Sequence, residues 1–248
     1  MRYDVADGVA TLTMDHVENR NAMTAELLNG LGTHLERALG DDHVRVIVLT
    51  NEGPAFSAGA DLKAGRGASP GGDYTLPRIL TLMLDGPKPV VGRIAGHCMG
   101  GGVGLAAACD LSIAAEDVRF GFTEVRIGVA PAVISVVVLP KLRRGDALEL
   151  FLTGERITAS RAVEVGLITR CAPPPSLDEA VSATVGQLVA GGPLALGAAK
   201  QLVRVVPGLN RDDAFSWTAQ RSAELFASEE AAEGMAAFRD RRPASWLR

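Results

Sequence analysis

The sequence predicts a mixed α/β fold in which helices pack on sheets, and three observations support that prediction. Short runs rich in β-branched residues, typical of buried strands, recur in the first half of the chain. They alternate with glycine-rich turns and with apolar residues at helical spacing. Beyond Pro131 the pattern is helical. This order favours layered sheets and helices over a β-sandwich or a helical bundle.

The N-terminal segment is predicted to contain a hairpin, a helix and a strand. Residues 3–14 alternate around Asp7-Gly8, which indicates a short hairpin with one buried face. Thr24 is a candidate N-cap for a helix, and Gly40 lies just past its expected end. The apolar residues with helical spacing between them are Leu27, Leu28, Leu31, Leu35 and Leu39. Residues 44–50 form a β-branched run typical of a strand covered on both faces.

The middle of the chain repeats the order strand, glycine turn, helix. The segment FSAGADL follows the buried strand through a turn at 51–54, and a glycine-rich stretch at 65–72 precedes a helix expected over 74–85. Residues 89–94 are predicted to form a second buried strand. After it, GHCMGGGVG is expected to lead into a small-residue helix, LAAAC, and then a strand, LSIA. We expect the loop at 63–75 to adapt the site to its substrate.

The C-terminal third is predicted to be a helical appendix of the same structural unit. Helices are expected over 132–142, 146–153 and 159–166, followed by alanine-rich segments over 177–242 that are separated by Pro193 and Pro207. No linker of suitable length or composition isolates this part as an independent domain. We therefore expect a core at 1–190 and a C-terminal helical region at 191–248.

The composition is that of an ordinary globular protein. The 248 residues are 47% hydrophobic with a formal net charge of −4, so one sizeable core can be buried. No apolar run approaches the ~20 residues of a membrane span, and the first residues carry acids, so a cytoplasmic location is expected. A pI near 5.6 with interleaved charges argues against a nucleic-acid surface. The scattered Cys98, Cys109 and Cys171 suggest neither a disulfide framework nor a zinc site, and we expect them to be reduced and buried.

Two glycine-rich turns are the strongest candidates for a catalytic site. FSAGADL and GHCMGGGVGL each follow a predicted strand and each precede a segment that reads as a helix, so their free N–H groups are able to face an anion. Each turn alone is more simply explained as a tight turn. Their occurrence on neighbouring strands favours an oxyanion hole.

Two other classes of enzyme are suggested by parts of the second turn. GHCMG matches the nucleophile elbow of α/β-hydrolases with Cys98 as the nucleophile, but that fold places its histidine after the nucleophile. All four histidines, His16, His34, His43 and His97, precede Cys98. Residues 102–107 fit the dinucleotide-binding pattern G-x-G-x-x-A, but no acidic residue ends a second strand at the expected offset. We interpret these small residues as allowing close helix packing.

Glu124 is the candidate acid, because it lies between short apolar stretches and precedes a Gly-Val-Ala-Pro turn. From spacing alone, a solvated or paired glutamate is the more common case.

Five segments, in this order and spacing, resemble the crotonase family of acyl-CoA enzymes. They are NRNAM at 19–23, FSAGADL at 56–62, GHCMGGGVGLAAACDLSIA at 96–114, FGFTEVRIGVAP at 120–131 and LTGERITASRAVEVGLI at 152–168. The resemblance implies a spiral of β-β-α turns with a C-terminal helical region that drives trimer formation, commonly giving a hexamer. It also implies an enoyl-CoA hydratase or isomerase with no cofactor, since coenzyme A is part of the substrate.

The resemblance assigns site residues by motif position. The backbone N–H groups of Ala60 and Gly101 would form the oxyanion hole, and Glu124 would be the catalytic acid. The thioester and the CoA moiety would contact Arg20, Ala22, Ala58, Asp61, Leu62, Lys63, Gly104, Pro131 and Arg241. Of these, Arg20, Lys63 and Arg241 would face phosphates or adenine, Arg241 by reaching a neighbouring subunit.

The chain departs from the family pattern at Gly104, where hydratases carry the first of two catalytic glutamates. Three alternatives follow. The first is a hydratase that relies on Glu124, with Gly104 leaving room for water or a bulkier acyl chain, in the branch that includes methylglutaconyl-CoA hydratases. The second is a 3-enoyl-CoA to 2-enoyl-CoA isomerase, for which one carboxylate suffices. The third is a non-catalytic acyl-CoA binder. If Glu124 lies in an apolar pocket, burial should raise its pKa.

Overall fold

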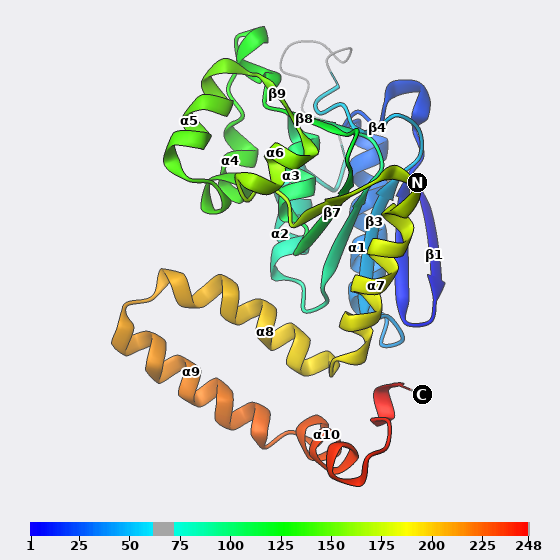
Figure 1. Ribbon diagram of the computed structural model, residues 1–248, viewed down its shortest axis with the longest axis vertical. Coiled ribbons are helices and arrows are strands. Elements are labelled where there is room, and N and C mark those ends of the chain that lie inside the picture. The colour runs from blue at the N-terminus through cyan, green and yellow to red at the C-terminus, as the bar shows by residue number, and fades with distance from the viewer. Residues whose placement is uncertain (62–71, 248) are drawn as a thin grey trace.

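Two sheets form the centre of the computed structural model, which describes residues 1–61 and 72–247 (Figure 1). Within that part of the chain, the larger sheet has the order β1 (Arg2–Ala6), β2 (Val9–Met14), β3 (Val46–Asn51), β5 (Val90–Ile94), β7 (Leu111–Ala115) and β10 (Arg170–Ala172). The smaller sheet has the order β4 (Ala55–Ser57), β6 (His97–Met99), β8 (Arg119–Gly121) and β9 (Arg156–Thr158). The outer pairs β1–β2 and β8–β9 are antiparallel, and the other pairs are parallel.

A repeated order of elements explains why there are two sheets. Three times in succession the chain adds one strand to the larger sheet, one to the smaller sheet, and then a helix. The helices that close these turns are α2 (Leu76–Asp85), α3 (Gly101–Ala108) and α4 (Ala132–Val138). This confirms the expected spiral of β-β-α turns, and it stacks the segments that leave β4, β6 and β8 beside one another.

The core lies between the sheets and their covering helices. Helix α1 (Ala25–Gly40) begins at Thr24, whose side chain accepts a hydrogen bond from the Leu27 N–H, as predicted. Helix α3 is buried along almost its whole length because its residues are small, with alanine and glycine at most positions. Helix α7 (Leu177–Ala190) packs on the other face of the larger sheet. The remaining helices beside the core are α5 (Arg144–Thr153) and α6 (Ala159–Glu164).

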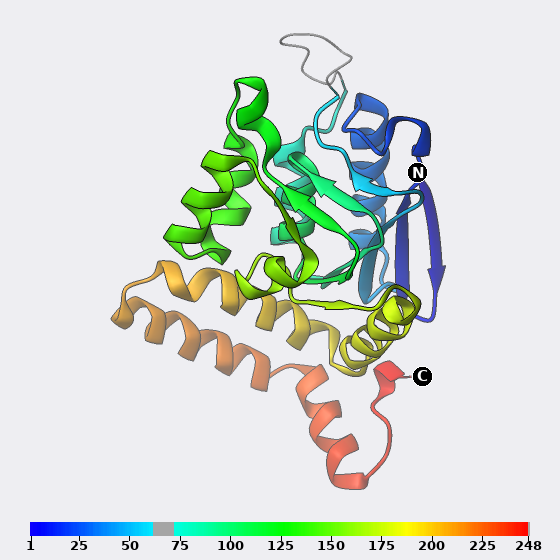
Figure 2. The same ribbon diagram turned by 45° about the horizontal axis from the view of Figure 1, so that its top comes forward.

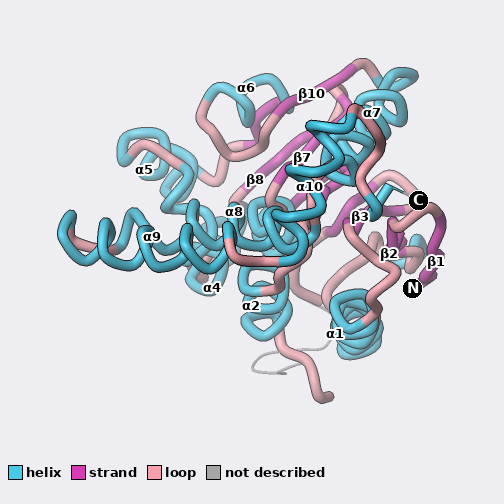
Figure 3. Tube along the Cα trace, turned by 90° about the horizontal axis from the view of Figure 1, so that it is seen from below, coloured by secondary structure: helices cyan, strands magenta, loops and turns pink. Residues whose placement is uncertain are grey.

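The last three helices leave the core as an arm: α8 (Pro193–Val205), α9 (Arg211–Phe226) and α10 (Glu229–Asp240). Figure 1 shows α8 and α9 running alongside each other, Figure 2 shows the arm extending beneath the sheets, and Figure 3 shows the arm from below. One polar joint to the core is Lys200, whose ammonium binds the Asp110 carboxylate at 2.8 Å and the Met83 and Lys88 carbonyls at 2.6 and 3.1 Å. Among the described residues, no single helix is long and apolar enough to cross a membrane.

The structure differs from the sequence prediction in three places. The triple glycine does not precede α3 but begins it, because glycine lets the helix approach the β4 turn closely. Strands β9 and β10 interrupt the region predicted as helical beyond Pro131, and at three residues each they are too short to show a strand pattern. Cys171 is only partly buried, whereas Cys98 and Cys109 are buried as expected, and all three are free thiols.

Candidate active site

A cleft of about 600 Å³ lies where the three β-β-α turns meet. Its walls come from the start of α1, the turn after β4, the start of α2, the start of α3, and the segment from Thr123 to α4. Most of the lining is apolar, including Met23, Leu28, Leu76, Val133 and Ile134. Among the described residues that line it, the charged side chains are Asp61 and Glu124. The cleft therefore suits an apolar group that is held by backbone polar atoms.

The first wall is the turn after β4, which the NRNAM segment holds in place. The Ala58 N–H donates to the Arg20 carbonyl at 3.0 Å, and the Met23 N–H donates to the Gly59 carbonyl at 2.8 Å. Met23 and Ala60 thereby form an isolated parallel bridge. In this parallel bridge, Met23 donates its N–H across to the other segment. The N–H of the residue paired with it, Ala60, then points to the opposite side. The Ala60 N–H is thus directed away from Met23.

The second wall is the start of α3. Gly100 has φ 51° and ψ −120°, a backbone conformation that side chains rarely allow, and this sharp turn ends β6 and starts the helix. Gly101 is the first helical residue, so its N–H has no partner inside the helix. The positive end of the helix dipole adds to the attraction of that N–H for an anion.

The two turns are in direct backbone contact. A Cβ placed on Gly59, whose φ is +86°, would lie 2.8 Å from the Met99 carbonyl oxygen and 3.3 Å from the Gly101 nitrogen. On Gly101, a Cβ would meet the Met23 sulfur at 2.6 Å. Gly59 cannot be replaced without strain, because it combines a positive φ with a backbone contact, whereas a Cβ on Gly101 would displace the end of the Met23 side chain. Ala60 and Gly101 both line the cleft. The structure therefore brings the two predicted donors to one place.

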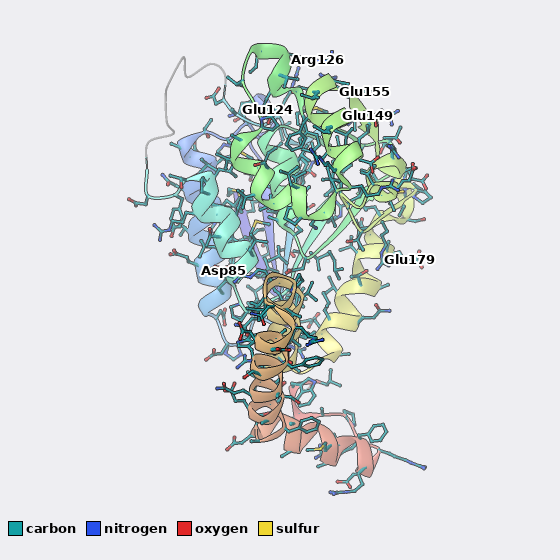
Figure 4. All side chains as sticks on the ribbon, turned by 90° about the vertical axis from the view of Figure 1, so that its left-hand side faces the viewer. Asp85, Glu124, Arg126, Glu149, Glu155 and Glu179 are labelled. Atoms are coloured by element: carbon teal, nitrogen blue, oxygen red, sulfur yellow. The ribbon has the colours of Figure 1, made fainter. Side chains whose placement is uncertain are left out.

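Glu124 lies in a 3-10 turn, η3 (Thr123–Ile127), at the edge of the same cleft. Its carboxyl faces Gly100, where a Cβ would lie 3.0 Å from Oε1. Oε2 is buried and has no hydrogen-bond partner in the described part of the chain. Burial raises the pKa of Glu124, as the sequence predicted, and only its own backbone N–H opposes the shift. Figure 4 shows Glu124 at the end of the molecule opposite the arm.

Gly104 does not leave the room that was expected of it. It is buried within α3, and a Cβ placed there would lie 2.3 Å from Cγ2 and 2.9 Å from Cβ of Ile134. Ile134, on α4, is 2% exposed and lines the cleft. The space that a second glutamate would need is therefore filled by a hydrocarbon side chain, and Gly104 itself does not line the cleft.

The structure places the other predicted site residues in three groups. Ala58, Asp61 and Pro131 line the cleft. Ala22 is buried behind it, and Arg20 contributes its carbonyl to the β4 turn while its side chain is exposed. Arg241 ends α10, in the arm, away from the cleft of its own chain. Leu62 and Lys63, like most of the loop at 63–75, lie outside the described residues.

Two features of the cleft were not predicted. Met23, Leu28 and Leu76 supply its apolar wall, and Ile134 seals it against α3. The first three sit at or near helix starts, which the capping residues Thr24 and Thr75 do mark in the sequence. The contact of Ile134 with Gly104 joins two helices, and no local pattern indicates it.

Neither alternative chemistry has a site here. Cys98 is completely buried, and burial raises the pKa of its thiol, which opposes a nucleophilic role. His97 accepts a hydrogen bond from the Arg119 N–H at 3.1 Å and does not line the cleft. Residues 102–107 lie inside α3, where a Cβ on Gly102 would meet the Ser57 carbonyl oxygen at 2.6 Å. As interpreted from the sequence, the small residues serve close packing.

A spiral of β-β-α turns that joins two backbone donors to one half-buried carboxyl defines the crotonase class of enzymes. The family described as enoyl-CoA hydratase/isomerase matches residues 4–248, and the chain belongs to that family.

Individual relatives agree with that assignment. A Thermus thermophilus protein provisionally named enoyl-CoA hydratase is 34% identical over 242 residues, covering 95% of this chain and 96% of the relative. A carnitinyl-CoA dehydratase from Salmonella arizonae is 31% identical over 247 residues, covering 96% and 94% of the two chains. The crystal structure of an enoyl-CoA hydratase from Mycobacterium smegmatis has a TM-score of 0.91 and 29% identity, covering 100% of this chain and 98% of that one. The chain is thus a hydratase-like enzyme of acyl-CoA metabolism.

Proposed function

We propose that this enzyme adds water to the double bond of a 2-enoyl-CoA thioester, with Ala60 and Gly101 as the oxyanion hole and Glu124 as the acid and base. The observation that carries the proposal is the position of the Glu124 carboxyl against Gly100, next to the Gly101 N–H. Donors and acid then act on adjacent atoms of one substrate, the thioester oxygen and the carbons beside it. A preorganised donor of this kind contributes about 2.7–4 kcal/mol to lowering the barrier.

One carboxyl is sufficient for the proton transfers of hydration. Ionised Glu124 accepts a proton from water as the water oxygen bonds to C3, and the π electrons move to the thioester oxygen as an enolate. The enolate then collapses, and C2 takes the proton from Glu124. The sum is the addition of one water molecule, with the carboxylate regenerated. The raised pKa of Glu124 helps the first step, because a carboxylate whose pKa lies closer to neutral pH is a stronger base toward water.

Isomerisation of 3-enoyl-CoA is the second candidate, and the packing of Ile134 on Gly104 favours it. With no second carboxyl at that position, Glu124 alone would remove a proton from C2 and return it to C4, which moves the double bond from C3 to C2. No water needs to be bound in this reaction.

We further propose a branched acyl group on the pattern of methylglutaconyl-CoA. The apolar lining supports a branch, because Met23, Leu28 and Ile134 offer only van der Waals contacts. A free carboxylate on the acyl chain finds no cationic side chain among the described residues of the lining. Comparing kcat/KM for 3-methylcrotonyl-CoA and 3-methylglutaconyl-CoA, which differ by a carboxylate, will show whether another residue of the protein supplies a cationic side chain.

The remaining proposals concern the state of the enzyme. We propose a homotrimer or a hexamer, supported by large apolar side chains that are exposed on the arm, such as Phe215, Phe226 and Phe238. We also propose that it works in the cytoplasm without a cofactor and without nucleic-acid or membrane partners.

The test is a paired assay of wild type and Glu124→Gln on short 2-enoyl-CoA and 3-enoyl-CoA, following both hydration and double-bond migration. Glu179→Gln is the matched control, since Glu179 is exposed on α7, away from Glu124 (Figure 4). Hydration that Glu124→Gln lowers by about 10²–10⁴ in kcat supports the proposal. If double-bond migration is detected and hydration is not, the enzyme is an isomerase. If neither reaction is detected while acyl-CoA still binds, the proposed reaction is rejected in favour of a non-catalytic acyl-CoA binder.

A further inference from the structure

Helices α3 and α4 are in contact through Gly104 and Ile134. Gly104 lies in the middle of α3, the helix whose first N–H is the Gly101 donor, and Ile134 lies in the first turn of α4, which follows the Glu124 segment. The 2.3 Å that would separate a Cβ on Gly104 from Ile134 Cγ2 is far below any real contact, so the two positions are mutually dependent. Ile134 fits because residue 104 has no side chain.

Ile134 belongs to two surfaces. One part of its side chain packs on α3, and the residue also lines the cleft together with Glu124, Ala60 and Gly101. Val133 and Pro131, its neighbours in the chain, also line the cleft. The side chain is 2% exposed, so the surrounding packing holds it in one place. Shortening it would open space on the inner side of the cleft rather than at its mouth.

We propose that Ile134 is the residue that limits the size of the acyl substituent beside Glu124, and that it does so because Gly104 lets it lie against α3. The inference rests on the proposed acyl-CoA function and adds a specificity determinant to it. A β-branched side chain is well suited to this role because it has few rotamers and cannot fold away from a bulky substrate.

The experiment measures dissociation constants by calorimetry for three saturated esters that need no turnover: butanoyl-CoA, 3-methylbutanoyl-CoA and 3,3-dimethylbutanoyl-CoA. In the wild type, affinity is expected to fall at the most branched ester. In Ile134→Ala, the ratio of the dissociation constants of the dimethyl ester and butanoyl-CoA should shift by about tenfold in favour of the dimethyl ester, as expected for one or two extra methyl groups buried. Val136→Ala is the control, because Val136 lies on the same helix, is 72% exposed and does not line the cleft.

A double-mutant cycle on the unfolding free energy tests the dependence on Gly104. In the wild type, Gly104→Ala should lower the free energy of unfolding strongly. In the Ile134→Ala background the same substitution should lower it much less, because the 2.3 Å contact is gone and only the 2.9 Å contact is left. Additive effects would overturn the link between the two positions.

The two proposals fail in different ways. An unchanged ester ratio in Ile134→Ala overturns the specificity role even if the wild type turns over enoyl-CoA. If the wild type shows no turnover of enoyl-CoA but Ile134→Ala does shift the ratio of dissociation constants, the proposed reaction is rejected and the specificity role of Ile134 stands. No binding of any of the three esters would overturn both.

Discussion

The core and the arm differ in how much of their surface they bury within one chain. Along α1, six residues are buried, and α3 is buried on nearly every side. In the arm, α8 and α10 each bury one alanine, Ala198 and Ala237, and α9 buries no residue fully. Phe238, on α10, is 88% exposed. The core can therefore account for its own stability, whereas the arm presents apolar surface that is suited to contact with another copy.

The cleft and the exposed apolar side chains of the arm also lie in different regions. Every described residue that lines the cleft belongs to the core, between Met23 and Ile134. Lys200 and Arg204, both on α8, join the arm to the core through ion pairs with Asp110 and Asp85. Substitutions in the two regions should thus have effects of different size on the free energy of unfolding, and four of them define the comparison.

The largest effect is expected in the core. Leu31→Ala removes a completely buried side chain from α1 and should lower the free energy of unfolding by about 2–5 kcal/mol. Unfolding in urea measures the loss, provided that the m-value is the same for both proteins. Leu148→Ala on α5 serves as the control, because the Leu148 side chain is half exposed. A loss below about 1 kcal/mol would show that the core repacks freely.

The next largest effect is expected at the joint. Lys200→Met keeps the length of the side chain, which is 9% exposed, but removes the ammonium from two carbonyls and from Asp110, which keeps its hydrogen bond from the Val90 N–H. We expect a loss of about 1–3 kcal/mol, because buried acceptors become unsatisfied. Burial already raises the pKa of Asp110, and loss of the ammonium should raise it further. Arg204→Met, which breaks an exposed pair with Asp85, should cost much less.

A smaller effect, and one of opposite sign, is expected at Glu124. Its pKa is higher in the folded state than in the unfolded chain, so ionisation opposes folding as the pH rises through the folded pKa. Glu124→Gln should therefore be slightly more stable than wild type at pH 8, and this gain should vanish below the ordinary glutamate pKa of about 4.3. Urea unfolding at pH 4 and pH 8 checks the sign. A variant that is less stable at both pH values would contradict it.

The smallest effect on unfolding is expected in the arm. Phe238→Ser should change the stability of the isolated chain by no more than about 0.5 kcal/mol, because the ring makes little contact within it. The same substitution should reduce the molecular mass of the assembly measured by light scattering. A triple variant combines Phe215→Ser, Phe226→Ser and Phe238→Ser. If its molecular mass is the same as that of the wild type, these side chains are not the basis of assembly.

Much of the core was predictable because its signals are local. The Asp7-Gly8 hairpin, the Thr24 cap and the β-branched run of β3 each depend on neighbours in sequence, and the structure confirms all three. The two glycine turns were likewise visible in the local sequence, whereas the role of Glu124 was predicted from the resemblance to the crotonase family. The strands β9 and β10 were missed because pairing with β8 and β7, far away in sequence, stabilises them.

The site was predictable in its backbone and less so in its side chains. Glycines 59, 100 and 101 are marked by motif, and the structure gives each a steric reason. The role of Gly104 was misjudged because an absent side chain was read as empty space. Whether that space is empty depends on Ile134, which lies 30 residues further along the chain and on another helix.

The backbone contact between Gly59 and the Met99–Gly101 segment has a consequence for how such an enzyme can diversify. Because the two turns touch without intervening side chains, the separation of the two N–H donors is set by main-chain geometry and is not adjustable by a single substitution. New substrates must then be accommodated by replacing side chains around a constant pair of donors. In this chain, α4 offers such positions, since Val133 and Ile134 line the cleft but belong to neither glycine turn.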